Sequence, residues 1–347
     1  MRPIAVCLGA LLAVPSPAAA ACWQEPKPLT IQEFGYVFEN QQRRLVRKET
    51  AGVPQSLALS GGGMKAAYGA GLLVGWGETG RRPDFSAVTG MGLSALVAPL
   101  AFLGAGQDRR IADLFFCEAL SFQELAERTS SFLDLATLEA IARKHETGGR
   151  LVVALPGSAA RSESVWDIGA IAASRSPAAQ AQIQHILLAA VDLTTVIDPA
   201  IVPATFGAVV ARNPTFRQIG AGEPFLRIEG FEAASGVTYL IHNGVLFPDE
   251  GATYTAQRGA ANGLLQRSEA LAQTKVLPVV PAYDFFRDAG TAGGSVHIAS
   301  PRPYLNIQPA SDFDVAYMRA LFLDAYRQGR MGREWRRTFE DATRSYR

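Results

Sequence analysis

The stretch of the sequence with the clearest chemical potential is a run of glycines that ends in a lysine, Gly61-Gly62-Gly63-Met64-Lys65. A short apolar segment, Leu57–Leu59, precedes this run, and a helical pattern follows it. The first N–H groups of a helix have no partner within the helix and carry the positive end of its dipole, so such a turn can bind an anion. Glycines let the backbone approach the ligand closely, and Lys65 adds a full positive charge. The sequence therefore predicts an anion-binding turn.

Several uses of this turn are open at the level of sequence. The string from Gly61 to Ala66 fits the glycine fingerprint of dinucleotide-binding proteins, which also needs an acidic residue at the end of the second strand. The nearest acid, Asp84, precedes that strand instead. A P-loop is excluded because no Gly-Lys-Ser/Thr sequence is present there. Two other interpretations remain open: an oxyanion hole, which stabilises charge on a carbonyl oxygen, and a tight strand–helix turn without a ligand.

Ser94 and His242 have the residue types of a nucleophile and its base. A serine hydroxyl needs a base to become a nucleophile, and imidazole is a better base than a carboxylate near neutral pH. Ser94 lies at the start of a predicted helix, where a hydroxyl commonly satisfies a free backbone N–H instead. The remaining histidines show no metal-binding spacing, and no cluster of cysteine and histidine exists. We expect no metal and no cofactor.

These motifs resemble those of the patatin-like phospholipases. Leu59 to Lys65 is similar to the Gly-Gly-Gly-x-Arg/Lys oxyanion motif of that family, and Val88 to Leu96 (VTGMGLSAL) is similar to its Gly-x-Ser-x-Gly nucleophile elbow. Trp166 to Ala172 and the stretch from Phe313 to Trp335 also resemble bacterial members. The likeness is strong over residues 57–104 and patchy over 190–300. It implies a three-layer α/β/α fold with a mainly parallel central sheet.

At the reaction centre the sequence departs from the family pattern. The resemblance implies a Ser–Asp dyad, but Gly92 stands at the nucleophile position, between the elbow glycine Gly90 and Ser94. His242-Asn243-Gly244-Val245 aligns with the Asp-Gly-Gly/Ala motif, so His242 takes the place of the aspartate. Ala66 replaces the glycine that usually follows the basic residue, and residues 190–200 keep little of the family pattern. Gly92 has no side chain and cannot act as a nucleophile.

The elements that position these residues follow from the hydrophobic pattern. Short apolar runs predict buried strands, and longer ones with helical spacing predict helices. Strand, tight turn and helix occur twice in succession, which is typical of parallel α/β architecture. The expected strands are 56–60, 85–89, 151–155 and 238–241, and the expected helices are 64–76, one from Ala95, 177–191 and 314–327. The uncharged stretch 90–106 predicts a buried helix rather than a membrane span, because it contains several glycines and Pro99.

Composition narrows the class of protein. The chain has 347 residues, of which 48% are hydrophobic and 19% charged, as expected of a packed globular protein. The net charge is +1, so no field of one sign would attract nucleic acid. We expect no nucleic-acid partner.

The N-terminus has the pattern of a signal peptide. Arg2 precedes a short apolar run, Ile4 to Val14, and small residues follow up to Ala21. We expect cleavage near Cys22 and export to the periplasm or the outer membrane. Cys22 would then be the lipidated first residue of a lipoprotein, although Ala19 stands where such signals usually have leucine, or it would pair with Cys117 in a disulfide.

The sequence thus predicts four segments: a signal peptide at 1–21, a lead-in at 22–54, a patatin-like α/β domain at 55–250 and a C-terminal extension at 251–347 that packs on the same domain. The resemblance implies a protein that binds a lipid or fatty-acyl ligand, a membrane surface or a protein partner, with hydrolysis impaired or lost. The alternative is an active lipid acyl hydrolase that uses a relocated Ser94 with His242. A third, weaker interpretation is a nucleotide-binding protein.

Overall fold

The computed structural model describes residues 53–116, 122–155, 164–191, 214–217, 225–228, 236–244, 295–302, 309–310, 314–332 and 335–337. The predicted signal peptide, Cys22, Cys117 and nearly all of the lead-in lie outside these residues. The predictions of export, lipidation and a disulfide therefore stay predictions.

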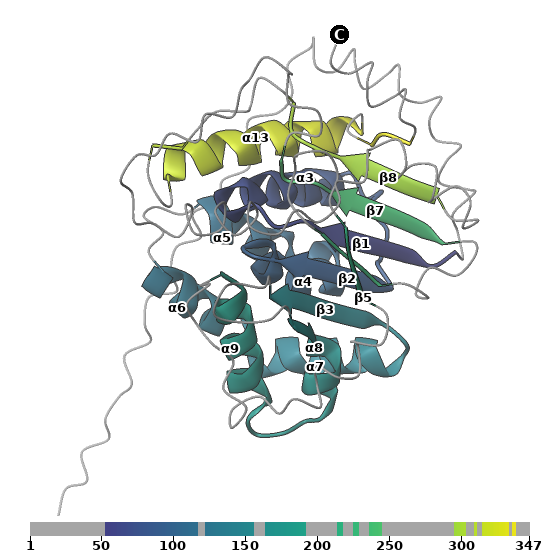
Figure 1. Cartoon of the computed structure of the whole chain (residues 1–347), viewed down its shortest axis with the longest axis vertical. Coiled ribbons are helices and arrows are strands. Elements are labelled where there is room, and N and C mark those ends of the chain that lie inside the picture. Colours follow the sequence, from purple (N-terminus) through teal and green to yellow (C-terminus); the bar gives the residue numbers. More distant parts are fainter. Residues whose placement is uncertain are drawn as a thin grey trace, which may run out of the picture.

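The chain has an α/β fold with a six-stranded, mainly parallel sheet flanked by helices (Figure 1). The strand order is β4-β3-β2-β1-β7-β8, and only β4 runs antiparallel to its neighbour. The six strands are β1 (Gln55–Leu59), β2 (Ala87–Met91), β3 (Arg150–Leu155), β4 (Ser164–Asp167), β7 (Val237–Ile241) and β8 (Ser295–Ala299). A separate antiparallel pair, β5 (Pro214–Arg217) and β6 (Phe225–Ile228), contacts β1 and β2 through β6. The predicted α/β class with a mainly parallel sheet is confirmed.

Three of the described helices begin at an aspartate cap. Asp134, Asp167 and Asp314 each precede a helix and accept a hydrogen bond from the backbone N–H three residues on, at 2.7, 2.9 and 3.0 Å. The described α-helices are α3 (Ala66–Glu78), α4 (Ser94–Leu103), α5 (Asp108–Phe116), α6 (Phe122–Phe132), α7 (Leu135–Glu146), α8 (Ile168–Ala173), α9 (Ala179–Val191) and α13 (Val315–Met331). Two short 3-10 helices, η2 (Gly63–Lys65) and η3 (Ala105–Gln107), precede α3 and α5.

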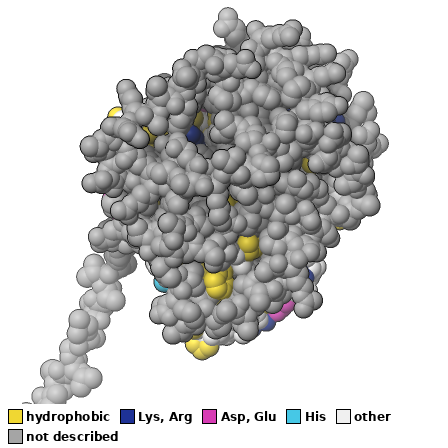
Figure 2. All heavy atoms as spheres, in the orientation of Figure 1, with side chains coloured by type: hydrophobic (Ala, Val, Ile, Leu, Met, Phe, Trp, Pro, Cys, Tyr) yellow, Lys and Arg dark blue, Asp and Glu magenta, His cyan; other side chains and the backbone are white. Residues whose placement is uncertain are grey.

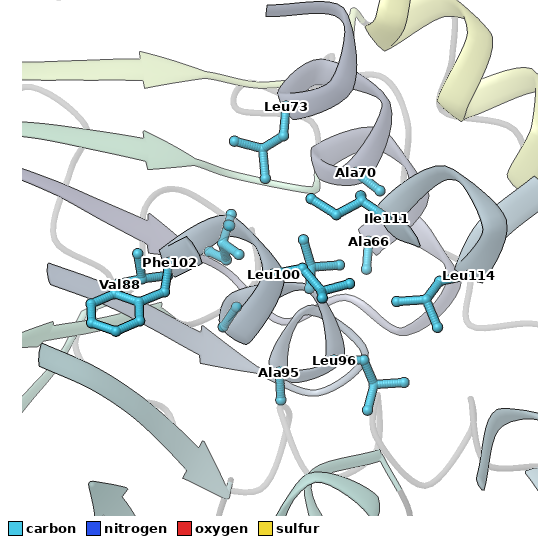
Figure 3. Close-up of a cluster of buried hydrophobic side chains, with 14 of the residues drawn as sticks. Ala66, Ala70, Leu73, Val88, Ala95, Leu96, Leu100, Phe102, Ile111 and Leu114 are labelled. Carbon is cyan, nitrogen blue, oxygen red and sulfur yellow. The ribbon is translucent and has the colours of Figure 1, made fainter. Parts of the chain in front are cut away.

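The main core lies between the sheet and these helices. Alternate strand residues such as Leu57, Leu59 and Val88 face it, as expected from the two-residue period of a strand. Figure 3 shows Val88 of β2 beside side chains from three helices. They are Ala66, Ala70 and Leu73 of α3, Ala95, Leu96, Leu100 and Phe102 of α4, and Ile111 and Leu114 of α5. A second, smaller cluster consists of strand residues only: Met91, Val152, Ala154 and Val165.

The uncharged stretch 90–106 forms the end of β2 and the ten-residue helix α4, whose residues are buried up to Phe102. The prediction of a buried helix is confirmed. Among the described residues, no helix is both long and apolar enough to cross a membrane. In Figure 2 the described side chains reach the surface only in small scattered groups, so this view shows no extended apolar or charged patch among them.

Two elements from the predicted C-terminal extension belong to this body. Strand β8 pairs in parallel with β7 at one edge of the sheet, and α13 packs along α3 (Figure 1). The two helices approach closely because α3 presents Gly71 and Gly75 to the backbone of α13. At the start of α13, the backbone N–H of Asp314 donates to the Sδ of the buried Met64 in η2. This contact connects the C-terminal helix to the glycine turn.

Candidate functional site

The predicted site residues meet at the carboxyl edge of the sheet. Strands β1, β2 and β7 are parallel, and Leu59 is in register with both Gly90 and Ile241. The segments that follow these three strands therefore emerge side by side. They contain the glycine turn, the elbow residue Gly92 and the pair His242–Asn243. This edge is where parallel α/β proteins generally place their ligands.

The glycine turn has the backbone geometry of an anion site. Gly62 and Gly63 have φ angles of +121° and +53°, which side chains other than glycine rarely tolerate. The N–H of Lys65 donates to the carbonyl of Gly62 (3.0 Å), and this bond closes the turn into η2 and α3. Within the described part of the chain, the N–H groups of Gly62 and Gly63 donate to no other residue. The turn therefore offers backbone donors to a ligand.

Gly92 forms a sharp turn between β2 and α4. Its φ is +55°, and its carbonyl accepts from the N–H of Ala95 at 2.9 Å. A Cβ atom built on Gly92 would meet only the Cα of Gly61, at 3.8 Å. The apex of the elbow therefore faces the glycine turn and has room for a side chain. Gly90, by contrast, lies so close to α4 that a Cβ there would be 2.9 Å from the carbonyl oxygen of Ser94.

Asn243 connects these parts through a buried hydrogen-bond network. Its Oδ1 accepts from the N–H of Gly69 (3.1 Å), which fixes the orientation of the amide. Its Nδ2 then donates to the carbonyls of Ser60 (2.8 Å) and Gly61 (3.1 Å) and to the Oγ of Ser94 (3.0 Å). The N–H of Asn243 donates to Ser60 Oγ at 2.9 Å. Asn243 thus holds the glycine turn, α3 and the start of α4 together.

This geometry does not activate Ser94. The Ser94 side chain is buried, and the group beside its hydroxyl oxygen is an amide N–H₂, which donates hydrogen bonds and cannot accept a proton. A general base would have to accept the hydroxyl proton at hydrogen-bond distance. The structure does not bring Ser94 and His242 into a hydrogen bond: Asn243 is the partner of Ser94 instead. The sequence analysis did not identify Asn243, although its place between a strand end and Gly244 is a signal of the kind used for His242.

His242 is fully buried at the end of β7. Its backbone N–H donates to the carbonyl of Ala299 in β8 (2.8 Å), but neither ring nitrogen has a hydrogen-bond partner in the structure. Burial, followed by the positive charges of Lys65 and Arg336, lowers the pKa of His242 from 6.5 to about 3. The imidazole is therefore neutral at physiological pH and has one donor and one acceptor to offer.

Asp84, the acidic residue that the nucleotide interpretation would need, does not lie at this edge. Asp84 precedes β2 and so lies toward the opposite edge of the sheet, where its exposed carboxylate pairs with Lys144. It is too far along the strand direction to reach a ribose bound at the glycine turn. The described residues also contain no group of three or more His, Cys, Asp and Glu side chains suited to a metal ion.

No protein-family model matches this chain, and no curated protein matches it either. The residues at the carboxyl edge and their geometry are therefore the basis for assigning a function.

Proposed function

We propose that this chain is a patatin-like α/β/α protein that binds a lipid or fatty-acyl ligand, or a protein partner, at the carboxyl edge of its sheet without hydrolysing it. The observation that carries the proposal is the hydrogen bond from Asn243 Nδ2 to Ser94 Oγ, next to an elbow apex that has no side chain. Among the described residues, the N–H groups of Gly62 and Gly63 have no acceptor, and Ser94, the hydroxyl nearest the elbow, has no base beside it.

The substituted positions support this proposal as a group. By the resemblance, Gly92 and His242 stand where the family has its serine and aspartate. Ser94 and Asn243 stand where the family has glycines, one in the elbow and one after the aspartate. These two replacements are hydrogen-bonded to each other at 3.0 Å. The pair therefore gives the altered centre a structural role in place of a catalytic one.

The competing proposal is an acyl hydrolase that uses Ser94 with His242, and one observation favours it: the ring nitrogens of His242 are free to act as a base. For this mechanism the Asn243 amide would have to leave Ser94 and the imidazole would have to reach it. A pKa of about 3 also makes His242 a weak base, since proton transfer is most efficient when the pKa of the base is near the working pH.

Hydrolysis of a short acyl ester such as p-nitrophenyl butyrate distinguishes the two proposals. We expect the natural protein to show no turnover above that of Ser94→Ala. Turnover that disappears in both Ser94→Ala and His242→Ala would establish the hydrolase.

A repaired variant tests the resemblance itself. It combines Gly92→Ser, Ser94→Gly and His242→Asp, and the space beside Gly92 admits the new side chain. The φ of +55° costs a non-glycine residue about 1–3 kcal/mol, a strain that the surrounding structure has to support. We expect measurable turnover only in the triple variant, because a nucleophile and its base act as a unit. Turnover no higher than that of the three single variants would count against a patatin-like centre.

A further inference from the structure

His242 is the one described group at the carboxyl edge whose hydrogen-bonding capacity is wholly unused. Both ring nitrogens are buried and have no hydrogen-bond partner within the described part of the chain. Leaving a buried polar atom unpaired is costly, and native proteins retain few such atoms, so each one calls for an explanation. Its neighbour Asn243, by contrast, is saturated on both sides of its amide. Asn243 therefore supports the fold at the carboxyl edge, whereas the imidazole beside it has no structural partner among the described residues.

The register of the sheet places His242 between the glycine turn and an arginine. Leu59 and Ala299 are both in register with Ile241, so the next residues on either side of His242 are Ser60 and Ser300. Ser60 leads directly into the glycine turn. Ser300 Oγ accepts a hydrogen bond from the guanidinium of Arg336, which is itself buried. His242 thus follows β7 between the strand that leads into the glycine turn and the strand whose Ser300 binds Arg336.

The charge around His242 selects the class of ligand. The charges of Lys65 and Arg336 act on the imidazole, and both are positive. Two cations, free backbone N–H groups and a neutral ring N–H form an environment suited to oxygen acceptors that carry negative charge. A phosphate or carboxylate group has this chemistry, and a monoprotonated phosphate also has a hydroxyl for the acceptor nitrogen of the ring.

We propose that His242 is a ligand-binding residue, whose imidazole hydrogen-bonds a phosphate or carboxylate group held between the Gly61–Gly63 turn and Arg336. This inference deepens the proposed function, on which it rests, because it names the group that the same site binds. It also gives the residue at the family's aspartate position a role in binding instead of proton transfer.

Calorimetric titration with three probes tests the proposal: inorganic phosphate, decanoate and decyl phosphate. We expect the natural full-length protein to bind at least one of them. His242→Leu, which removes both nitrogens at similar volume, should weaken that binding roughly tenfold or more. His242→Gln, which keeps one donor and one acceptor, should retain part of the affinity. Lys65→Ala should also weaken binding. Tighter binding of decyl phosphate than of inorganic phosphate would identify a lipid headgroup as the source, and equal binding a free phosphate.

His297→Leu is the matched control. His297 is also a buried histidine on a neighbouring strand, but it lies within β8, where its ring packs edge-on against Tyr239 at 5.0 Å between centroids. We expect this variant to bind the probes as the natural protein does.

Unfolding of the same variants separates a binding role from a structural one. If His242 serves a ligand, His242→Leu should be at least as stable as the natural protein in the absence of probe, because it removes two unpaired buried polar atoms. A large loss of stability would show a structural role and overturn the proposal. Equal probe affinity in the natural protein and His242→Leu, or no binding of any probe, would overturn it as well. Ester hydrolysis by the natural protein would overturn the proposed function instead, and is measured separately.

Discussion

Asn243 and His242 are neighbours in the chain, yet their side chains are in opposite situations. The Asn243 amide hydrogen-bonds to residues that precede it by 149 to 183 positions, whereas the imidazole of His242 has no hydrogen-bond partner among the residues that the structure describes. No local pattern distinguishes two such residues, because the distinction depends on which strands become neighbours. The sequence analysis could therefore place a polar pair at a strand end but could not say which member supports the fold.

At the residue scale, Asn243→Ala should cost about 2–4 kcal/mol of unfolding free energy. The substitution leaves the N–H of Gly69 and the carbonyls of Ser60 and Gly61 without their buried partner. Ser94→Ala removes a single bond of the same network and should cost only about 1 kcal/mol. Urea unfolding of both variants measures the difference. Similar costs for the two would show that Asn243 does not hold the network together.

The two buried histidines should make the protein less stable in acid. Burial, followed by the charge of Arg337, lowers the pKa of His297 from 6.5 to about 4. Between these two pH values the unfolded chain binds a proton that the folded protein does not, so the free energy of unfolding rises with pH. The contribution of His297 reaches its full value above about pH 6.5.

His297→Phe isolates this effect. It should reduce the slope of unfolding free energy against pH by about 1.4 kcal/mol per pH unit between pH 4 and 6.5, and leave it unchanged above pH 7. Denaturant unfolding of the variant and the natural protein at several pH values measures the slope. Parallel curves through this range would contradict the lowered pKa.

At the scale of elements, the hydrophobic pattern predicted most of what surrounds the site. The expected strands at 56–60, 85–89, 151–155 and 238–241 correspond to β1, β2, β3 and β7, and the expected helices to α3, α4, α9 and α13. Their boundaries differ by a few residues, as is usual for frayed ends. The strands and α4 were recognisable from short runs of buried apolar residues, and α13 from the helical spacing of its buried residues, such as Met318, Phe322 and Ala325. β8 was not predicted, because the short segment 295–299 contains a serine and a histidine among its five residues.

At the scale of elements, the close approach of α3 and α13 can be tested by adding a single methyl group to a glycine of α3. A Cβ on Gly75 would lie 2.0 Å from the carbonyl oxygen of Tyr326, so the helices would have to separate. Gly75→Ala should therefore destabilise the protein by about 3 kcal/mol, although alanine alone favours a helix by about 1 kcal/mol.

Gly106→Ala is the control, because a Cβ there meets nothing within 4 Å and the residue has no positive φ. Its effect should stay within about 0.5 kcal/mol. Thermal unfolding of the two variants checks both values. A neutral Gly75→Ala would mean that α13 tolerates displacement from α3.

At the scale of the whole molecule, the site depends on parts of the chain that are far apart in sequence. The glycine turn and the elbow come from the first third, whereas β7, β8 and α13 come from the last third, and all of them surround one edge of the sheet (Figure 1). The order of strands explains this arrangement, since β1 lies between β2 and β7. Topology of this kind is not contained in the pattern of any single segment, so the sequence analysis recognised the elements but not their neighbours.

Export is the remaining prediction at this scale. If residues 1–21 are a signal peptide, the mature protein made in a bacterium should begin at or near Cys22. Mass spectrometry of the N-terminal peptide from the envelope fraction measures this directly, and a diacylglyceryl adduct on Cys22 would show lipidation. Recovery of the chain from the cytoplasm with its first residues intact would refute export.

The contact between Asp314 and Met64 has a consequence for how the protein is made. The glycine turn is synthesised early, but the residue that holds Met64 follows 250 positions later, and Asn243 follows Ser60 by 183. A ribosome working at about 5–20 residues per second therefore releases the turn many seconds before its supports exist. Contacts of such long sequence separation also slow the folding search itself. The nascent chain therefore passes through a long period in which the glycine segment is present without its supports, and the proposed ligand site would be complete only when nearly the whole chain has emerged.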